Sequence, residues 1–177
     1  VENVAGSDFA RYAESAIMQP LGMRSTYSQA PGEPWQEHSS QGYVFKSGQP
    51  VRQRFEYVVP APVGALSASA DDIGRLMIEL LEPGGSSVLS ADAKQQLLGR
   101  AGIAPAEVNG ATLGLFEMSL GNGVRAVGHD GSTMLFHSRM ILWPEQRLGL
   151  FVSTNTDTGS EAVEHLTTAF AERYGLA

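Results

Sequence analysis

The sequence contains no cysteine, no basic stretch and no long apolar run. Without cysteine the chain can form neither disulfide bonds nor thiolate metal sites. Its net charge is −7 and its 12 lysines and arginines are scattered, so it offers no basic face to a nucleic acid. No stretch approaches the roughly 18 apolar residues that a membrane-spanning helix needs. These absences exclude a disulfide scaffold, a nucleic-acid-binding protein and a membrane span, and they leave the cellular compartment open.

The 177 residues, 42% of them hydrophobic, are enough to bury a sizeable core. Ser7 or Asp8 can cap a first helix, which Pro20 ends. Its apolar side chains recur at intervals of three and four residues and are predicted to share one face of an amphipathic helix: Phe9, Tyr12, Ala13, Ala16 and Ile17. The sequence that follows is rich in Pro, Gly, Gln and Ser, with a candidate hairpin at residues 42–51. Residues 1–62 are thus predicted to hold the end of a helical region and a long, irregular excursion.

The rest of the chain predicts further helices and antiparallel strands. A capping pattern at Ser69 begins the helix with the clearest apolar stripe, and Ser90 caps a shorter one. A Gly-rich region follows and should contain one or two strands. Apolar runs at residues 140–143 and 148–152 predict a hairpin, and a helix over residues 160–174 closes the chain. Helices therefore lie at both ends, with strands mainly in the second half.

The most informative motif is Gly-His-Asp-Gly-Ser at residues 128–132, which follows a strand predicted at residues 124–127. Glycine has no Cβ, so the glycines beside His129 let a substrate lie against bare backbone. The alternative is that His129 bonds a neighbouring backbone group and the glycines serve a β-bulge. A metal site built on His129, Asp130 and His137 is a weaker hypothesis, because these residues lack the spacing of metal-binding motifs. The motif indicates one wall of an active site without a metal or cofactor.

Four segments carry a resemblance to a known family. They are Ile-Met-Gln-Pro-Leu-Gly-Met-Arg-Ser-Thr at 17–26, Val-Gly-Ala-Leu-Ser-Ala-Ser-Ala-Asp-Asp-Ile at 63–73, the motif at 128–132, and Leu-Phe-Val-Ser-Thr-Asn at 150–155. Their order and spacing resemble the C-terminal half of the class C type of serine β-lactamase and penicillin-binding-protein-like hydrolases, which include esterases and D-aminopeptidases. The resemblance implies an α+β, β-lactamase/transpeptidase-like fold, an antiparallel sheet packed with terminal helices. Residues 63–177 would then be the C-terminal part of its α/β domain, with the His-Asp-Gly strand and the terminal helix.

In that family the reaction needs a Ser-x-x-Lys pair, a Tyr-x-Asn motif and a Lys-Thr-Gly-like triplet on an edge strand. The sequence contains no Ser-x-x-Lys, and Ser90 with Lys94 is one residue too long. Tyr27-Ser28-Gln29 imitates Tyr-x-Asn, but it follows the Pro-Leu-Gly-Met turn, whereas the family's tyrosine lies upstream of that helix. By resemblance, both motifs are expected in a portion that ends before Val1.

The resemblance also implies roles for the motif, in which His129 replaces the lysine and Asp130 the threonine. His129 would lie near the proton network and the substrate carboxylate, and the Ser132 N–H would supply half of the oxyanion hole. His129 and Ser132 are therefore the predicted catalytic residues, and Asp130 and Gly131 the predicted substrate-binding residues. The Ser132 hydroxyl is not expected to be the nucleophile, because the family uses this position through its backbone and no base other than His129 is near it. A histidine at the lysine position is more typical of the esterase and peptidase branches than of dedicated β-lactamases.

Two classes of function follow. In the first, the chain is the C-terminal portion of a serine hydrolase that cleaves a β-lactam, a D-amino-acid peptide or a small ester through an acyl-enzyme, and alone it is inactive. In the second, it is a non-catalytic half that binds or complements a partner chain. In both, an exposed sheet edge or face should associate with the missing N-terminal part or with another copy. The family implies a periplasmic or secreted location, which the residues do not separate from a cytoplasmic one.

Overall fold

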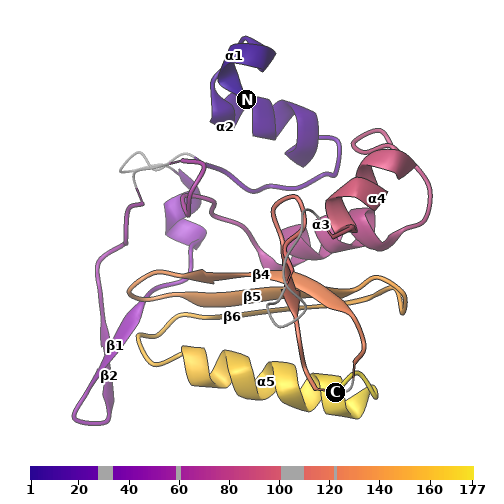
Figure 1. Cartoon of the computed structure of the whole chain (residues 1–177). Helices are drawn as coiled ribbons and strands as arrows, with labels where there is room; N and C mark the ends of the chain where they lie inside the picture. Colours follow the sequence, from indigo (N-terminus) through magenta and orange to yellow (C-terminus); the bar gives the residue numbers. More distant parts are fainter. Residues whose placement is uncertain (28–33, 59–60, 101–109, 122) are drawn as a thin grey trace.

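The centre of the structure is a four-stranded antiparallel sheet (Figure 1). The computed structural model describes residues 1–27, 34–58, 61–100, 110–121 and 123–177. Within them the strand order is β3-β4-β5-β6, with bounds Phe116–Met118, Ala126–Ser132, His137–Trp143 and Leu148–Thr154. The hairpin predicted from the two apolar runs is confirmed as β5 and β6, which pair along their whole length.

The Gly-His-Asp-Gly-Ser motif forms the last five residues of β4, so the strand predicted at residues 124–127 continues through it. Glycines and polar side chains are more typical of turns than of strand interiors. Each residue from Val127 to Ser132 instead has a partner on β5, and this pairing keeps the motif extended.

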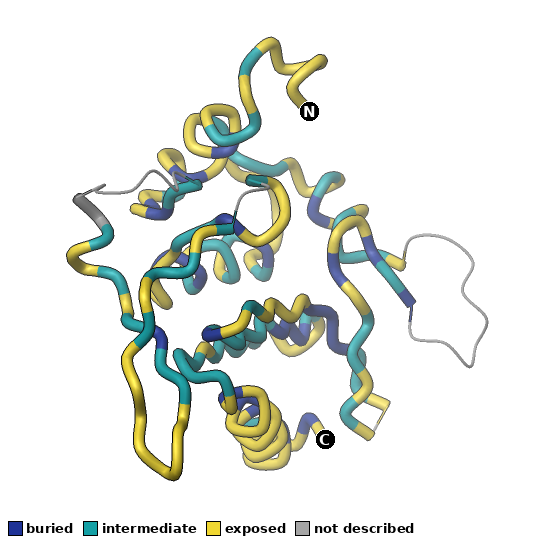
Figure 2. The backbone as a smooth tube through the Cα atoms, turned by 90° about the vertical axis from the view of Figure 1, so that its left-hand side faces the viewer, coloured by how far each residue is buried: buried dark blue, intermediate teal, exposed yellow. Residues whose placement is uncertain are grey.

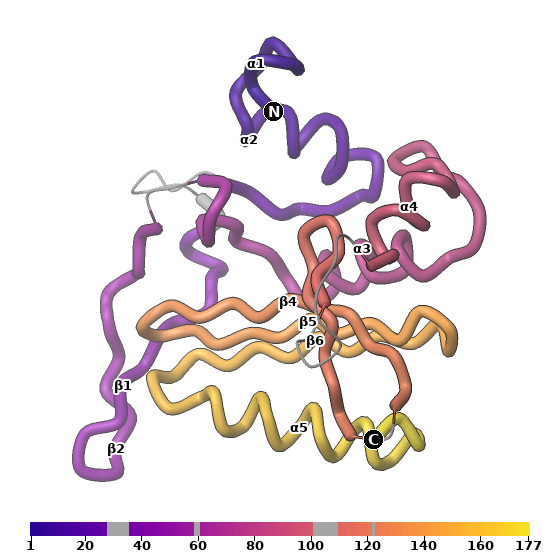
Figure 3. The backbone as a smooth tube through the Cα atoms, viewed as in Figure 1, coloured from indigo at the N-terminus to yellow at the C-terminus, as the bar shows by residue number. Residues whose placement is uncertain are grey.

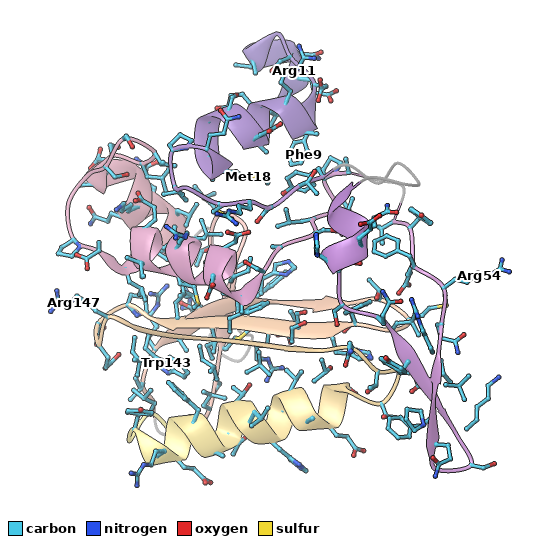
Figure 4. All side chains as sticks on the ribbon, turned by 180° about the vertical axis from the view of Figure 1, so that it is seen from behind. Phe9, Arg11, Met18, Arg54, Trp143 and Arg147 are labelled. Carbon is cyan, nitrogen blue, oxygen red and sulfur yellow. The ribbon has the colours of Figure 1, made fainter. Side chains whose placement is uncertain are left out.

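Two helices lie against opposite faces of the sheet. α5 (Ser160–Arg173), predicted over residues 160–174, runs beneath it, and α3 (Ala70–Leu81) lies above it (Figure 3). Because side chains alternate between the two faces of a strand, Trp143 packs toward α5 and Val127 toward α3. Both side chains are fully buried, and Trp143 lies between the sheet and α5 (Figure 4). The sheet is thus the middle layer of three.

Serine side chains cap α3 and α4, as predicted. Ser69 caps α3 and Ser90 caps α4 (Ala91–Leu98), each accepting a hydrogen bond from a backbone N–H of the first turn. Lys94 is buried in α4, and its Nζ lies 3.1 Å from Glu79 Oε1 on α3. Ser90 and Lys94 therefore have structural roles, one as a helix cap and the other in an ion pair between two helices.

The first amphipathic helix contains a π-helical turn that the sequence pattern did not predict. α2 (Phe9–Ala13), capped by Asp8, continues as the π-helical turn η1 (Glu14–Met18). Such a turn holds more residues than an α-helical one, so it rotates the side chains that follow. Met18 is buried in place of Ile17, and both Ile17 and Tyr12 are exposed. The predicted apolar face is therefore only partly buried, through Ala13.

The remaining elements are short and peripheral: α1 (Glu2–Ala5), the 3-10 helix η2 (Pro34–His38), β1 (Tyr43–Lys46) and β2 (Gln49–Arg52). The hairpin predicted at residues 42–51 is confirmed as β1 and β2. Ser47 and Gly48 at its turn both have positive φ, 49° and 77°, which a tight two-residue hairpin turn requires. Figure 2 shows the tip of this hairpin exposed. At its base, Tyr43 N donates to Asn155 O just beyond β6, so the excursion is attached to the end of the sheet.

Candidate active site

The two halves of β4 have different neighbours. Val127 and Gly128 pair with β3 on one side and with β5 on the other. Among the described residues, those from 129 to 132 pair with β5 alone. All four of these residues are exposed. We call residues 129–132 the open edge, because no described strand covers their outer side.

The hydrogen-bond pattern of the β4–β5 hairpin determines which backbone groups face the open edge. In an antiparallel pair, hydrogen-bonded and non-hydrogen-bonded residue pairs alternate. Thr133 N donates to Phe136 O at 2.9 Å, at the turn of the hairpin. By alternation along the register, Ser132 and Asp130 belong to non-hydrogen-bonded pairs. Their N–H and C=O groups therefore point away from β5, into the open edge.

His129 and Gly131 share the α3 side of the sheet, since they alternate with Asp130 and Ser132. The centroid of the His129 ring lies 5.7 Å from that of Phe116, the first residue of β3. A Cβ added at Gly131 would meet no atom within 4 Å. This side of the open edge therefore combines an exposed imidazole with bare, accessible backbone.

Gly128 serves a different purpose from Gly131. A Cβ at Gly128 would run into the backbone oxygen of Met140 and the side chain of Met118, so only glycine fits between the strands. The register between β4 and β5 continues without an inserted residue from Val127 to Ser132. The alternative in which the glycines serve a β-bulge is therefore wrong, and Gly128 is a packing residue.

Asp130 directs its carboxylate to the α5 side of the sheet. Arg139 of β5 binds both of its oxygens, through Nε and Nη2 at 2.8 Å each. The third contact of Arg139 is from Nη1 to Glu164 Oε2 of α5, at 2.7 Å. The hydrogen bond to Asp130 raises the pKa of Arg139 above its usual value; burial opposes this rise and Glu164 adds to it. The Asp130 carboxylate therefore ties β4 to β5 and, through Arg139, to α5.

Ser132 has a partner that sequence reasoning missed. His137, opposite it on β5, places Nδ1 3.2 Å from Ser132 Oγ. The expectation that no base other than His129 is near Ser132 is therefore wrong. The two residues are five apart in sequence, and only the tight hairpin between them makes them cross-strand neighbours. The register of the hairpin is the signal that could have revealed the pair.

Two of the four family-like segments meet at Asp72, near the start of α3. Its carboxylate accepts hydrogen bonds from Arg24 N and Ser25 Oγ, both at 3.0 Å. Thr26 and Ser67 join the same segments through two backbone hydrogen bonds. Burial acts to raise the pKa of Asp72, but its hydrogen bonds, with Arg24 N first among them, outweigh burial and hold the pKa below its usual value. Sequence reasoning did not reveal these contacts, because the partners of Asp72 lie far away in the chain.

Glu56 in the excursion holds the turn of the β4–β5 hairpin. Its two carboxylate oxygens accept hydrogen bonds from Met134 N at 2.9 Å and Leu135 N at 3.3 Å. A cavity of about 520 Å³ lies nearby, within the excursion. Its lining includes Gln41, Arg52 and Phe55, but none of residues 128–132. The open edge is therefore an exposed wall rather than the lining of this cavity.

The described residues contain no group of three or more His, Cys, Asp or Glu side chains that could hold a metal ion. Within the same part of the chain, no helix is both long and apolar enough to cross a membrane. Ser28 and Gln29 of the Tyr-x-Asn-like triplet lie outside the described residues.

Several solved structures share this fold, an antiparallel sheet between helices. The chain is 26% identical to an octameric penicillin-binding protein homologue from Pyrococcus abyssi, over 98% of this chain and 39% of that one, with a TM-score of 0.74. It is 24% identical to a D-stereospecific amidohydrolase from a Streptomyces species, over 99% and 51%, with a TM-score of 0.70. It is 18% identical to a class C β-lactamase from Rhodobacter sphaeroides, over 98% and 56%, with a TM-score of 0.73. A comparison with curated proteins gave no match.

These similarities define the class of protein as α+β, with the fold of penicillin-binding proteins and β-lactamases. A family model described as Beta-lactamase matches residues 1–173. The chain belongs to the beta-lactamase family. It spans 39% to 56% of the length of the three solved structures named above.

Proposed function

We propose that the chain supplies the oxyanion strand of a serine hydrolase, which cleaves amide or ester bonds through an acyl-enzyme. The observation that carries this proposal is the open edge. The Ser132 N–H points into it, and the exposed His129 ring lies beside it on the same stretch of β4. A fixed backbone N–H at an edge strand is suited to stabilise the negative charge that develops on a carbonyl oxygen during acyl transfer.

The nucleophile of this reaction lies outside the 177 residues. The sequence has no Ser-x-x-Lys, and Ser90 and Lys94, which come nearest to the motif, are a helix cap and a member of a buried ion pair. In the proposed reaction a serine from the remainder of the enzyme attacks the substrate carbonyl. The Ser132 N–H then donates a hydrogen bond to the carbonyl oxygen, on which the negative charge develops. His129 belongs to the network that moves the proton.

The proposed substrates are a β-lactam, a D-amino-acid peptide or a small ester. Solved structures with this fold include a D-stereospecific amidohydrolase and a class C β-lactamase, so the fold is compatible with both amide and lactam cleavage. A histidine in place of the lysine favours the esterase and peptidase branches. Asp130 would contact substrate through its outward-facing backbone, because its carboxylate is held by Arg139 on the α5 side. Gly131 would let the substrate approach the strand closely.

A second candidate function is a non-catalytic half that binds or complements another chain. It is favoured by the outer edge of β6, an apolar strand of seven residues that no described strand pairs with on that side. An uncovered strand edge is a template for another strand. We propose that this edge associates with the N-terminal part of the enzyme or with a second copy. One solved relative in this fold is octameric.

One experiment tests both parts of the proposal. The 177-residue chain is assayed alone and as part of the complete protein, against a chromogenic β-lactam and a short-chain aryl ester, with its sedimentation recorded at micromolar concentration. The chain alone should associate and should show only background hydrolysis, because without the nucleophile there is no covalent route. The complete protein should hydrolyse at least one substrate.

Three outcomes would contradict the proposal or one of its parts. A serine-directed covalent inhibitor that abolishes activity and labels a serine within residues 1–177 would place the nucleophile in this chain. A complete protein that hydrolyses neither amides, lactams nor esters would favour the non-catalytic role. A stable monomer in sedimentation would count against association through the edge of β6.

A further inference from the structure

The last residue pair of β4 and β5 joins Ser132 to His137 by their side chains. Ser132 Oγ lies 3.2 Å from His137 Nδ1, and Thr154 Oγ1 donates to His137 O from β6 at 3.3 Å. This pair stands where the strand ends, directly before the turn. It also carries the backbone N–H that the proposed reaction uses. The position of Ser132 therefore matters more than that of an ordinary strand end.

The backbone joins Ser132 to β5 only through its neighbours, Gly131 and Thr133. Ser132 and His137 form a non-hydrogen-bonded pair, so they exchange no backbone hydrogen bond with each other. This arrangement is required if the Ser132 N–H is to point into the open edge. The side-chain hydrogen bond to His137 joins the two strands at this pair without using that N–H.

Asp130, the other residue whose amide faces the open edge, shows the same arrangement. It also belongs to a non-hydrogen-bonded pair, and the Arg139 guanidinium opposite it binds its carboxylate through two hydrogen bonds. Each of the two residues whose amide faces the open edge thus makes a side-chain contact with its partner on β5, and both contacts lie on the α5 side of the sheet. The repetition at alternate residues indicates that these contacts hold the edge in shape.

The surroundings of the His137 ring favour one of its two neutral tautomers. Its Nε2 is shielded from solvent and has no hydrogen-bond partner among the described residues. A buried N–H without an acceptor is costlier and rarer than a buried acceptor without a donor. The proton of the neutral ring should therefore reside on Nδ1, which donates to Ser132 Oγ.

We propose that His137 is a positioning residue, which donates from Nδ1 to Ser132 Oγ and thereby fixes the Ser132 N–H in the open edge. This inference rests on the proposed function, in which the fixed Ser132 N–H stabilises the charge on the substrate oxygen. Arg139, Asp130 and Glu164 lie on the same side of the sheet and are already bonded to one another. His137 touches no substrate and acts through Ser132.

The kinetic test uses the complete protein and an aryl ester. His137→Phe keeps an aromatic ring but removes the donor. It should lower kcat roughly tenfold with KM changed less than about twofold, because a misplaced Ser132 N–H stabilises the transition state less well. His137→Asn carries an N–H at the same distance from the backbone as Nδ1, and it should restore most of the loss. His165→Phe on the exposed side of α5 is the matched control and should not differ from the wild type.

A double-mutant cycle separates positioning from general stability. Ser132→Ala keeps the backbone N–H but removes the acceptor, so it should cost as much as His137→Phe, and the double variant should cost no more than either. Additive losses would overturn the proposal, as would a loss in kcat that His137→Asn does not restore. A His137→Phe variant with unchanged kcat would overturn it too.

A measurement without substrate distinguishes failure of this inference from failure of the proposed function. The 15N shifts of the His137 ring, recorded on the 177-residue chain, should show the proton on Nδ1, and Ser132→Ala should change them. A proton on Nε2 would overturn the hydrogen bond and with it the inference, even if the enzyme is active. If the proton is on Nδ1 but the complete protein hydrolyses nothing, the hydrogen bond between His137 and Ser132 stands. Both the proposed function and the positioning role are then overturned.

Discussion

The two halves of β4 are built on one continuous strand and differ in almost every other respect. Residues 126–128 are buried, with Ala126 1% and Val127 0% exposed, whereas residues 129–132 are all exposed. The first half lies between β3 and β5, and the second half has β5 alone. The difference arises where β3 ends, because pairing on both sides uses every backbone N–H and C=O. Pairing on one side leaves alternate amides for a ligand.

Residue types follow this division. The first half has small or apolar residues, which fit between neighbouring strands and the side chains of α3 and α5. The second half has His129, Asp130 and Ser132, and polar or charged residues are the ones that protect a strand edge from unwanted pairing. The same strand therefore serves stability in one half and, in the proposed function, chemistry in the other.

The largest expected effect is a difference in stability between two variants, each with one methyl group added to one half of β4. Gly128→Ala should lower the free energy of unfolding by about 3 kcal/mol, because the new Cβ would meet the rigid backbone of Met140. Gly131→Ala should change it by less than about 0.5 kcal/mol, because open space surrounds that position. Urea unfolding of both variants measures the difference. Equal losses would show that the two halves are not packed differently.

The next largest effect should come from the open edge itself. In the complete protein, His129→Ala should lower kcat/KM by roughly 10²-fold, as expected for a positioned proton-transfer group, which corresponds to about 2.7 kcal/mol of transition-state stabilisation. The fold should stay intact, because His129 is exposed. His165→Ala, on the exposed side of α5, is the matched control and should be nearly silent. Steady-state hydrolysis with circular dichroism decides the matter, and equal losses in both variants would make His129 a structural residue.

The smallest effect concerns Glu117, which holds β3 beside the buried half of β4. Its carboxylate lies 2.8 Å from Arg100 Nη2 and 3.1 Å from Arg125 Nε. Burial acts to raise the pKa of Glu117, but the hydrogen bonds from Arg125 and Arg100 outweigh burial and hold the pKa below its usual value of 4.5. Its contribution to stability is therefore complete above that value and is lost as the pH falls through the lowered pKa.

Glu117→Gln should accordingly reduce the free energy of unfolding by about 1 kcal/mol at neutral pH. The difference from the wild type should shrink as the pH falls below 4.5 and through the lowered pKa of Glu117. Urea unfolding at several pH values measures it, with Glu145→Gln in the exposed β5–β6 turn as the control. A difference that stays constant with pH would mean that Glu117 acts through packing rather than charge.

Local signals in the sequence predicted the elements whose causes are local. Serine caps, the turn of the β1–β2 hairpin and the apolar strands β5 and β6 all depend on residues close together in the chain, and they lie where they were expected. The π-helical turn that shifts the phase of the first helix was not predicted, because apolar spacing alone does not reveal such a turn.

The contacts around the candidate site could not be predicted in the same way. The Ser132–His137 pair depends on the register of a hairpin, and the hold of Glu56 on Met134 joins residues 78 apart. Neither has a spacing that a motif search recognises. The motif itself was found from its residue types, but its place inside β4 follows from pairing with β5. The roles of His129, Asp130, Gly131 and Ser132 stay predictions for the experiments above.

The alternation of side chains along the open edge limits how substitutions at residues 129–132 can change what this edge presents to a ligand. Asp130 and Ser132 send their side chains to the α5 side, where Arg139 and His137 bind them. In the proposed function, a ligand at the edge would therefore meet main-chain groups at these two positions, and main-chain groups are the same whatever side chain a residue carries. Mutation can readily alter the side-chain contacts on the α5 side, but it hardly changes the pattern of backbone donors and acceptors at the open edge. A change of substrate preference would then have to arise in the surrounding loops, while this strand is inherited as a common part.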